Sequence, residues 1–363
     1  MLLEAKMLKS SKNIKKFKFI IFFIPHHHIG GAERVHLNII KALNCRPIVF
    51  FDYSDSKVIS KEFNDSSFCF FTTGLKRKRI AVYFVQLMSL FFPVILFGSN
   101  SPFFYEMLTK VKKNVRSIDL THAFTSSGKG MENISLGCVD KINSRIVINT
   151  KTLKDYELLY NSNGVPSSLM ERFKIIANGV KIHKFDHTQI ESRFQNFTIG
   201  FVGRNSPEKR PELFFEIVKK LKVKAKVIGD HFESYKKEFP AITYFENCND
   251  EAQIRQQFLN ISVLIVSSSS EGFPLVIMEA MELGIPVIST DVGSIFEHVN
   301  NNENGFLLPV DDKQFINGAI QKINKLSSDK ELYVRISRTA RAHAVQRFEI
   351  AFFNEQYQEL FYE

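Results

Sequence analysis

Two glutamates, Glu271 and Glu279, lie eight positions apart in the segment SSSSEGFPLVIMEAM, residues 267–281. A Gly-Phe-Pro turn separates them, and Pro274 falls near the first position of an apolar helix, where its missing N–H removes no hydrogen bond. The free amides at such a helix start favour an anion. Ionised carboxylates can also accept hydrogen bonds from a pair of sugar hydroxyls. The segment therefore allows three interpretations: an acid/base pair, two ligands for one substrate, or a capped helix with a charged face.

Two cations follow a second apolar run in TIGFVGRNSPEK, residues 198–209. Arg204 leaves the end of the predicted strand, and Lys209 precedes the next predicted helix. An arginine fork and a lysine point charge on either side of such a turn can neutralise a diphosphate. Solvated loop charges are the alternative interpretation.

A glycine pair follows the first predicted strand. Gly30 and Gly31 come after IPHHHI and begin a helix that carries Glu33 and Arg34 in its first turn. Two glycines let a backbone approach a phosphate closely. His26–His28 are adjacent and lack the i, i+4 spacing of helical metal ligands, so we expect no metal there.

Short β-rich runs alternate with helical-period segments along the chain, which predicts parallel sheets covered by helices. We expect two doubly wound α/β units that meet near residue 190. The predicted strands are 17–25, 46–53, 93–99, 116–124, 144–150 and 173–179 in the first unit, and 198–203, 225–230, 261–268 and 286–291 in the second.

The composition is that of a globular protein. At 363 residues with 44% hydrophobic side chains, the chain exceeds what one core usually supports. Its cysteines are scattered, which suits a reducing compartment and buried thiols: Cys45, Cys69, Cys138 and Cys248. The apolar run after the basic N-terminus is too short to span a membrane and no cleavage site follows, so we expect a buried first strand and a cytoplasmic protein.

Positive charge is concentrated in the first half. Residues 1–190 hold 28 Lys and Arg against 14 Asp and Glu (+14), and residues 191–363 hold 20 against 24 (−4). No nucleic-acid-binding motif accompanies the charge. An anionic membrane surface fits better, because the N-terminal arm is rich in lysine and 76–79 (KRKR) adjoins an apolar run. A solvated basic surface is the alternative interpretation. Pro93 interrupts that run, so a buried or membrane-facing helix at about 80–92 is favoured over a spanning one.

The order of GGAER, NGV, GRNSPEK, SEGFPLVIMEAMELGIPVISTDVGSIFEHV and NGFLLPVDD resembles the family 4 retaining glycosyltransferases of the glycosyltransferase-B fold. The likeness covers 25–43 and 173–312, and its most specific element is the pair of glutamates with seven residues between them. It implies two Rossmann-like domains facing across a cleft. Residues 1–190 would bind the acceptor, 191–347 would bind the nucleotide sugar, and a helix at 348–363 would pack back on the first domain.

The resemblance also implies a role for each matching residue. Arg204 and Lys209 would hold the donor diphosphate and stabilise the charge of the leaving group. Glu271 would lie beside the hydroxyls of the donor sugar, Glu279 would bind the ribose, and His122 would touch the transferred sugar. The remaining donor-binding positions are Gly30, Gly31, Gly203, Gly272, Phe273, Pro274 and Leu275.

There are departures from the family pattern. FGSNS stands where many members have His-x-His, with Asn100 as a possible substitute, and residue 210 is Arg where a small residue or Asn is common. The segment 51–115 matches nothing in the family and is expected to build the acceptor site.

The function implied is retaining transfer of a hexose from a UDP- or GDP-sugar to a saccharide or lipid-linked saccharide in cell-surface polysaccharide or lipopolysaccharide synthesis. The sequence has no Asp-x-Asp motif, and the resemblance implies that no metal or other cofactor is required. The enzyme would be peripheral on the cytoplasmic face of the inner membrane. The rival hypotheses are a nucleotide-sugar epimerase or a glycogen-type synthase of the same fold and, in another class, an inactive nucleotide-sugar or nucleic-acid binding module.

Overall fold

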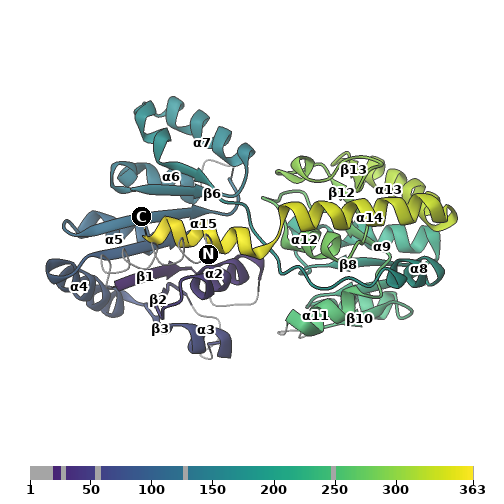
Figure 1. Ribbon diagram of the computed structural model, residues 1–363, viewed down its shortest axis with the longest axis horizontal. Coiled ribbons are helices and arrows are strands. Elements are labelled where there is room, and N and C mark those ends of the chain that lie inside the picture. Colours follow the sequence, from purple (N-terminus) through teal and green to yellow (C-terminus); the bar gives the residue numbers. More distant parts are fainter. Residues whose placement is uncertain (1–18, 26–29, 54–58, 126–129, 247–250, 363) are drawn as a thin grey trace, which may run out of the picture. The chain divides into compact units, whose positions relative to one another are not determined.

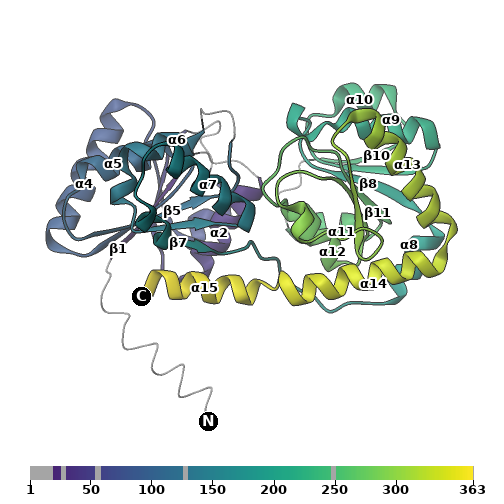
Figure 2. The same ribbon diagram turned by 90° about the horizontal axis from the view of Figure 1, so that it is seen from above.

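The computed structural model describes residues 19–25, 30–53, 59–125, 130–246 and 251–362. The chain divides into two compact units (Figures 1 and 2), one of residues 1–177 with 352–363 and the other of residues 178–351. The division therefore falls between Ala177 and Asn178, whereas the sequence suggested a boundary near residue 190.

The first unit is built on a seven-stranded sheet with the order β3-β2-β1-β4-β5-β6-β7. All its strand pairs are parallel. The strands are β1 (Phe19–Ile24), β2 (Ile48–Phe51), β3 (Phe68–Phe71), β4 (Val94–Ser99), β5 (Val115–Thr121), β6 (Ser144–Val147) and β7 (Phe173–Ile175). The helices are α2 (Gly31–Ala42), α3 (Lys61–Ser66), α4 (Leu75–Phe91), α5 (Pro102–Lys110), α6 (Met131–Ser135), η2 (Leu136–Lys141), α7 (Thr150–Ser162), η3 (Ser167–Arg172) and α15 (Ile350–Tyr362), whose last residues belong to this unit.

Helices cover both faces of this sheet, which explains the unbroken apolar run of β1. Successive residues of a strand point to opposite faces. Phe23 accordingly packs on Phe103 of α5, with ring centroids 5.6 Å apart, and Phe22 stacks on Phe361 of α15 at 5.9 Å. The Gln358 side chain further ties α15 to this unit by donating to the carbonyl of Ala42.

The second unit holds a six-stranded parallel sheet with the order β10-β9-β8-β11-β12-β13. Its strands are β8 (Thr198–Val202), β9 (Lys224–Ile228), β10 (Thr243–Phe245), β11 (Val263–Val266), β12 (Val287–Thr290) and β13 (Gly305–Leu308). The helices are α8 (Thr188–Gln195), η4 (Pro207–Lys209), α9 (Pro211–Leu221), α10 (Glu233–Glu238), α11 (Glu251–Phe258), α12 (Leu275–Glu282), η5 (Ile295–Glu297), α13 (Asp312–Ser328) and α14 (Lys330–Arg347).

The α/β class and the two parallel sheets confirm the predicted fold class, and three short strands were missed. These are β3, β10 and β13, each of three or four residues. Several predicted strands were too long: 46–53 and 261–268 each contain a strand of only four residues, 144–150 ends at Val147 and 173–179 ends at Ile175. Asn149 instead caps α7, its side chain accepting from the amide of Thr152 at 2.7 Å.

The helix predicted at about 80–92 begins earlier, at Leu75, so that 76–79 form part of α4. Within the described residues, no helix is both long enough and apolar enough to cross a membrane.

The order of the second sheet decides where a ligand can bind. The strand order reverses between β8 and β11, which lie side by side although more than sixty residues separate them in the sequence. Loops that leave the carboxyl ends of such neighbouring strands diverge and form a crevice. These loops are 203–210 after β8 and 267–274 after β11, and they carry both cations and the first glutamate of the sequence motif.

Candidate functional site

The loop after β8 begins at Gly203, whose positive φ of 158° suits glycine. A β-carbon at Gly229, in the neighbouring loop after β9, would lie 1.9 Å from the carbonyl oxygen of Gly203. The two loops therefore pack too closely for a side chain at residue 229. The Arg204 guanidinium projects from this loop and is largely exposed. It lies 3.4 Å from the carboxylate of Glu208, which also accepts from the Ser206 hydroxyl at 2.7 Å. Glu208 thus positions Arg204 without burying its charge.

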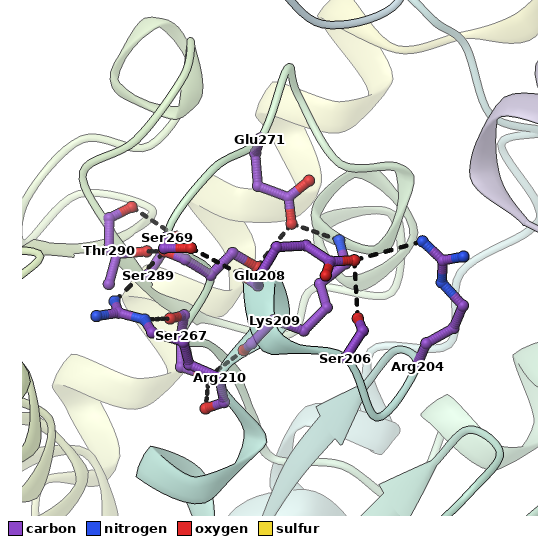
Figure 3. A network of polar contacts seen from close by, with 11 residues as sticks. Arg204, Ser206, Glu208, Lys209, Arg210, Ser267, Ser269, Glu271, Ser289 and Thr290 are labelled. Atoms are coloured by element: carbon purple, nitrogen blue, oxygen red, sulfur yellow. Dashed lines mark hydrogen bonds and ion pairs between the residues drawn. The ribbon is translucent and has the colours of Figure 1, made fainter. Parts of the chain in front are cut away.

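The ammonium of Lys209 and the carboxylate of Glu271 form an ion pair between the two loops, with Nζ and Oε1 2.5 Å apart (Figure 3). The same carboxylate oxygen accepts a hydrogen bond from the Ser268 hydroxyl at 2.6 Å. The Lys209 and Glu271 side chains are 23% and 11% exposed, so the pair is shielded yet reachable from solvent. Two residues that the sequence singled out separately are therefore in direct contact.

Arg210, the departure noted in the sequence, ties loops together instead of adding a free charge. Its guanidinium donates to the carbonyl oxygens of Ser267 and Val310 at 2.7 and 2.8 Å and to Asp312 at 2.8 Å. The Ser267 hydroxyl in turn donates to the carbonyl of Lys209 at 2.8 Å (Figure 3). Arg210 adopts a left-handed φ of 46°, and this network offsets the strain of that conformation.

The turn that carries Glu271 and Gly272 is braced from the loop after β12. Ser294 donates from both its amide and its hydroxyl to the carbonyl of Gly272, each at 2.9 Å. Gly293 has a φ of 61°, and a β-carbon there would lie 2.1 Å from the carbonyl oxygen of Glu271. The backbone around Glu271 is therefore fixed by close packing that only glycine at 293 permits.

The Phe273 side chain anchors this turn by packing into the interior of the second unit. It is buried and packs on the ring of His298, with centroids 4.4 Å apart, and on Phe348 at 5.5 Å. Only its backbone is therefore suited to a ligand. Pro274 was predicted near the first helical position, and it is the N-cap directly before it, with φ −73° and ψ 133°; α12 begins at Leu275.

Glu279 lies on the second turn of α12, as expected, and lines a small pocket with Val180, Lys181, His183 and Arg255. This carboxylate is half-buried at the pocket wall. The pocket brings together the NGV segment, α11 and α12, and none of its lining residues belongs to the two strand-end loops.

A third glutamate on α12, Glu282, was missed by the sequence reading. It is buried, and its carboxylate lies 3.0 Å from the guanidinium of Arg341 and accepts from the amide of His183 at 3.0 Å. Glu282 thus holds the segment after NGV against α12. The sequence MEAME shows that a second glutamate follows Glu279 on the same helix. Only its burial in the structure distinguishes the anchoring carboxylate of Glu282 from that of Glu279.

In the first unit, Gly30 is the N-cap of α2 in extended conformation and Gly31 is the first helical residue. His122 follows β5, and its Nε2 lies 3.0 Å from Nε2 of His36 on α2. Burial lowers the pKa of His122 to about 4, against the opposing charge of Glu33. Burial lowers the pKa of His36 as well, which favours the neutral form of both imidazoles, and either Nε2 can be the donor in this contact. His36 was not predicted as a site residue, because a histidine among the apolar residues of a helix is typical of a core position.

Other predicted positions are placed as follows. Asn100, after β4, adopts a left-handed φ of 50°. Of the described cysteines, Cys138 is buried, Cys69 is intermediate and Cys45 is exposed, so the expectation of buried thiols holds for one of the three. Cys248 and His26–His28 lie outside the described residues. Where the structure describes the chain, no three His, Cys, Asp or Glu side chains gather in a way that could hold a metal ion.

Comparison with known proteins identifies the second unit. Residues 183–343 match the family model of glycosyl transferases group 1. A capsular polysaccharide biosynthesis glycosyltransferase of Staphylococcus aureus, CapM, is 29% identical over 193 residues, which is 47% of this chain and 49% of that protein. The chain thus spans about half the length of the curated relatives it matches.

Solved structures extend the likeness to the whole fold. HepE of Anabaena in complex with UDP has a TM-score of 0.74 at 20% identity, with 95% of this chain and 99% of that chain covered. The apo form of the lipopolysaccharide outer core galactosyltransferase WaaB has a TM-score of 0.68 at 18% identity, with 95% and 99% covered. At this level of identity the structures establish a shared fold, the glycosyltransferase-B fold.

Proposed function

Residues 183–343 match the family model of glycosyl transferases group 1. On this basis we propose that the chain transfers a hexose from a nucleotide sugar, with retention, to a saccharide or lipid-linked saccharide. The observation that carries the proposal is the Lys209–Glu271 pair, at the point where the order of the second sheet reverses. A cation for phosphate and a carboxylate for sugar hydroxyls are the two groups that a nucleotide-sugar site needs at adjacent positions.

Lys209 and Arg204 would act on the leaving group. Glycosyl transfer passes through an oxocarbenium-like state while negative charge builds on the departing phosphate oxygen. Cations held in place before the reaction stabilise that charge without reorganising. Arg204 is exposed and retains donors for phosphate, and Lys209 is held by Glu271 until a diphosphate competes for it.

Glu271 and Glu279 would bind the sugar and the ribose, so neither needs to act as acid or base. Glu271 lies on the braced turn that precedes α12, and Glu279 lies one turn into that helix. The amides at the start of α12 lie between them in the sequence and suit a diphosphate. In a same-face retaining reaction, the leaving phosphate can accept the proton of the acceptor.

The donor is proposed to be a UDP-sugar, with a GDP-sugar as the alternative. HepE, which shares the fold across 95% of this chain, was solved with UDP. No metal ion is proposed to take part. Full turnover in the presence of a chelator supports this, and activity that is lost with chelator and restored by a divalent cation contradicts it.

The acceptor is proposed to be a saccharide or lipid-linked saccharide of a cell-surface polymer, handled by the first unit at the cytoplasmic face of the membrane. CapM, named for capsular polysaccharide biosynthesis, and WaaB, named for the lipopolysaccharide outer core, motivate this choice. The excess of positive charge in residues 1–190 is consistent with an anionic membrane nearby.

The test is release of nucleoside diphosphate from a panel of UDP- and GDP-sugars, with and without membrane extract. We expect release from one donor to rise when extract is added, and the anomeric configuration of the product, measured by NMR, to match the donor. Glu279→Ala should raise the KM for donor. A donor altered without any acceptor would indicate an epimerase, and salt-sensitive polynucleotide binding without nucleotide release would indicate a binding module.

A further inference from the structure

The outward face of α4 is apolar along most of its length. Ile80, Tyr83, Leu87, Leu90 and Phe91 lie on one side of this helix, and each is more than half exposed, from 56% to 71%. Figures 1 and 2 both show α4 beside α5 at the periphery of the first unit. Five large apolar side chains on one helix face therefore meet solvent together.

The opposite side of α4 packs into the hydrophobic core of the first unit. Ala81, Val82 and Val85 are buried in the cluster that includes Phe103 of α5. An ordinary surface helix buries one apolar stripe and exposes polar residues on the other face. On α4 the second stripe is also apolar, and contiguous apolar patches of this kind mark interaction sites.

Positive charge borders this face at its N-terminal end. Lys76, Arg77 and Arg79 are exposed in the first turns, and the 17 residues of α4 include no Asp or Glu. The helix is therefore basic at its start and apolar in the remainder, without compensating negative charge of its own.

A second group of cations lies beside the later part of the helix. The Gln86 side chain donates to the carbonyl of Lys110 at 3.0 Å, and the Asn114 side chain donates to the carbonyl of Ser89 at 3.0 Å. These bonds hold the 110–114 loop against α4, and the exposed Lys112 and Lys113 lie in that loop. The apolar face thus has basic residues near both ends.

We propose that the outward face of α4 lies in the surface of an anionic lipid bilayer. A helix with apolar and aromatic side chains beside lysines and arginines binds in the interfacial plane, with its apolar face among the headgroups and upper acyl chains. Each cation near an anionic surface adds attraction. The inference rests on the proposed function, since a lipid-linked acceptor lies at such a surface.

A second copy of this chain fits the face less well. If two α4 helices paired antiparallel about a two-fold axis, each basic N-terminal turn would meet the other's 110–114 loop, which carries lysines. Neither α4 nor that loop provides an acidic partner, so the cations would be desolvated against like charge. Anionic lipid headgroups supply the missing negative charge.

The absence of tryptophan from the whole sequence provides a direct probe. The full-length Leu87→Trp variant carries one tryptophan on this face, and Leu158→Trp carries one at a position on α7 that is 70% exposed, as a matched control. With vesicles containing phosphatidylglycerol, we expect the emission of Leu87→Trp to shift to the blue and to be quenched by brominated lipid. The emission of Leu158→Trp should change in neither respect.

Vesicle sedimentation measures the strength of binding. Leu87→Gln combined with Phe91→Gln should reduce partitioning about tenfold or more, because both side chains would leave the buried interface. Lys76→Gln combined with Arg79→Gln should reduce it about tenfold on anionic vesicles and leave binding to neutral phosphatidylcholine vesicles unchanged. Leu158→Gln should bind like the wild type.

Equal responses from Leu87→Trp and Leu158→Trp would overturn the proposal. So would an oligomer of the wild type that Leu87→Gln dissociates while vesicle binding stays unchanged, which would assign the face to a second copy. Vesicle binding is measured without donor or acceptor, so a failure of the proposed transferase function leaves this result intact. Conversely, the Leu87→Gln/Phe91→Gln variant should retain membrane-independent nucleotide release even if its vesicle binding is lost.

Discussion

Removing the ammonium of Lys209 tests the proposed site most directly. In Lys209→Ala the Glu271 carboxylate loses its partner at 2.5 Å and keeps the hydrogen bond from the Ser268 hydroxyl at 2.6 Å. The turn that carries Glu271 is braced independently by two hydrogen bonds from Ser294. The substitution should therefore remove one charge from the site and leave the fold in place.

The expected magnitudes differ sharply between activity and stability. Loss of one preorganised group that stabilises developing charge costs about 2 to 4 kcal/mol in the transition state. That corresponds to roughly a 30- to 1000-fold decrease in turnover. The pair is partly exposed, so its loss should change the free energy of unfolding by only about 1 kcal/mol or less. A large kinetic effect with a small stability effect is the signature of direct participation.

The assay is nucleotide release under saturating donor, together with urea unfolding of the same preparations. Lys219→Ala is the matched control, because Lys219 is exposed on α9 of the same unit and away from the two loops. It should leave both turnover and stability near the wild-type values.

A double-mutant cycle separates two roles of Lys209. If the ammonium acts on the phosphate, Lys209→Ala should lower turnover in the Glu271→Gln background as well. If it only orients Glu271, its removal should cost little once Glu271 is altered. Wild-type turnover in Lys209→Ala, or a loss that disappears in the Glu271→Gln background, would refute the proposed contact with the leaving group.

Three further predictions concern the parts that hold the fold and the site. Gly293→Ala should destabilise the second unit by about 2 kcal/mol or more, because φ is +61° and the new β-carbon would lie 2.1 Å from the carbonyl oxygen of Glu271; an unchanged urea midpoint would contradict this. Burial lowers the pKa of His298 to about 4 in the folded state, whereas the unfolded state keeps the ordinary value near 6.5. Between these values the unfolded state binds one more proton at this residue, so the free energy of unfolding of the wild type decreases as the pH falls from about 6.5 to 4. His298→Phe should flatten the pH dependence of the unfolding free energy there, and two parallel curves would reject that assignment. The Arg145 guanidinium lies 3.4 Å from the carboxylate of Asp119, and both side chains are buried. Arg145→Met should lower the free energy of unfolding by about 3 to 5 kcal/mol, because it leaves the buried Asp119 carboxylate without its cation. A loss below about 1 kcal/mol would show that Asp119 is neutral.

The strands that the sequence revealed are mostly buried, and the edge strand β7 is an exception. β1, β4 and β11 are continuous apolar runs buried on both faces, and such runs can be recognised without knowledge of their neighbours. β3, β10 and β13 are all edge strands; β3 and β10 have partly exposed residues, and β13 is a four-residue strand that follows a turn. Their pairing is imposed by the adjacent strand, so local sequence carries little signal for them.

The same distinction holds for side chains. Arg210 and Lys209 are adjacent and both basic; the family resemblance distinguished Lys209 from Arg210, but the sequence did not show what Arg210 contacts. In the fold, Arg210 is committed to Ser267, Val310 and Asp312, whereas Lys209 meets Glu271. Likewise Glu279 and Glu282 share one helix, and burial with Arg341 distinguishes the anchoring carboxylate from the one that lines the pocket.

The sequence by itself determined the α/β class, most of the parallel strands and the residue types available for binding a nucleotide sugar, because apolar periodicity and turn chemistry are local properties. Tertiary structure alone decided that Lys209 and Glu271, 62 residues apart, form one ion pair. It also decided that the α4 helix leaves an apolar face uncovered. Both features depend on which strands and helices become neighbours. Hydrogen bonding between β8 and β11 brings two loops together that are distant in the sequence, and packing against α5 buries only one side of α4.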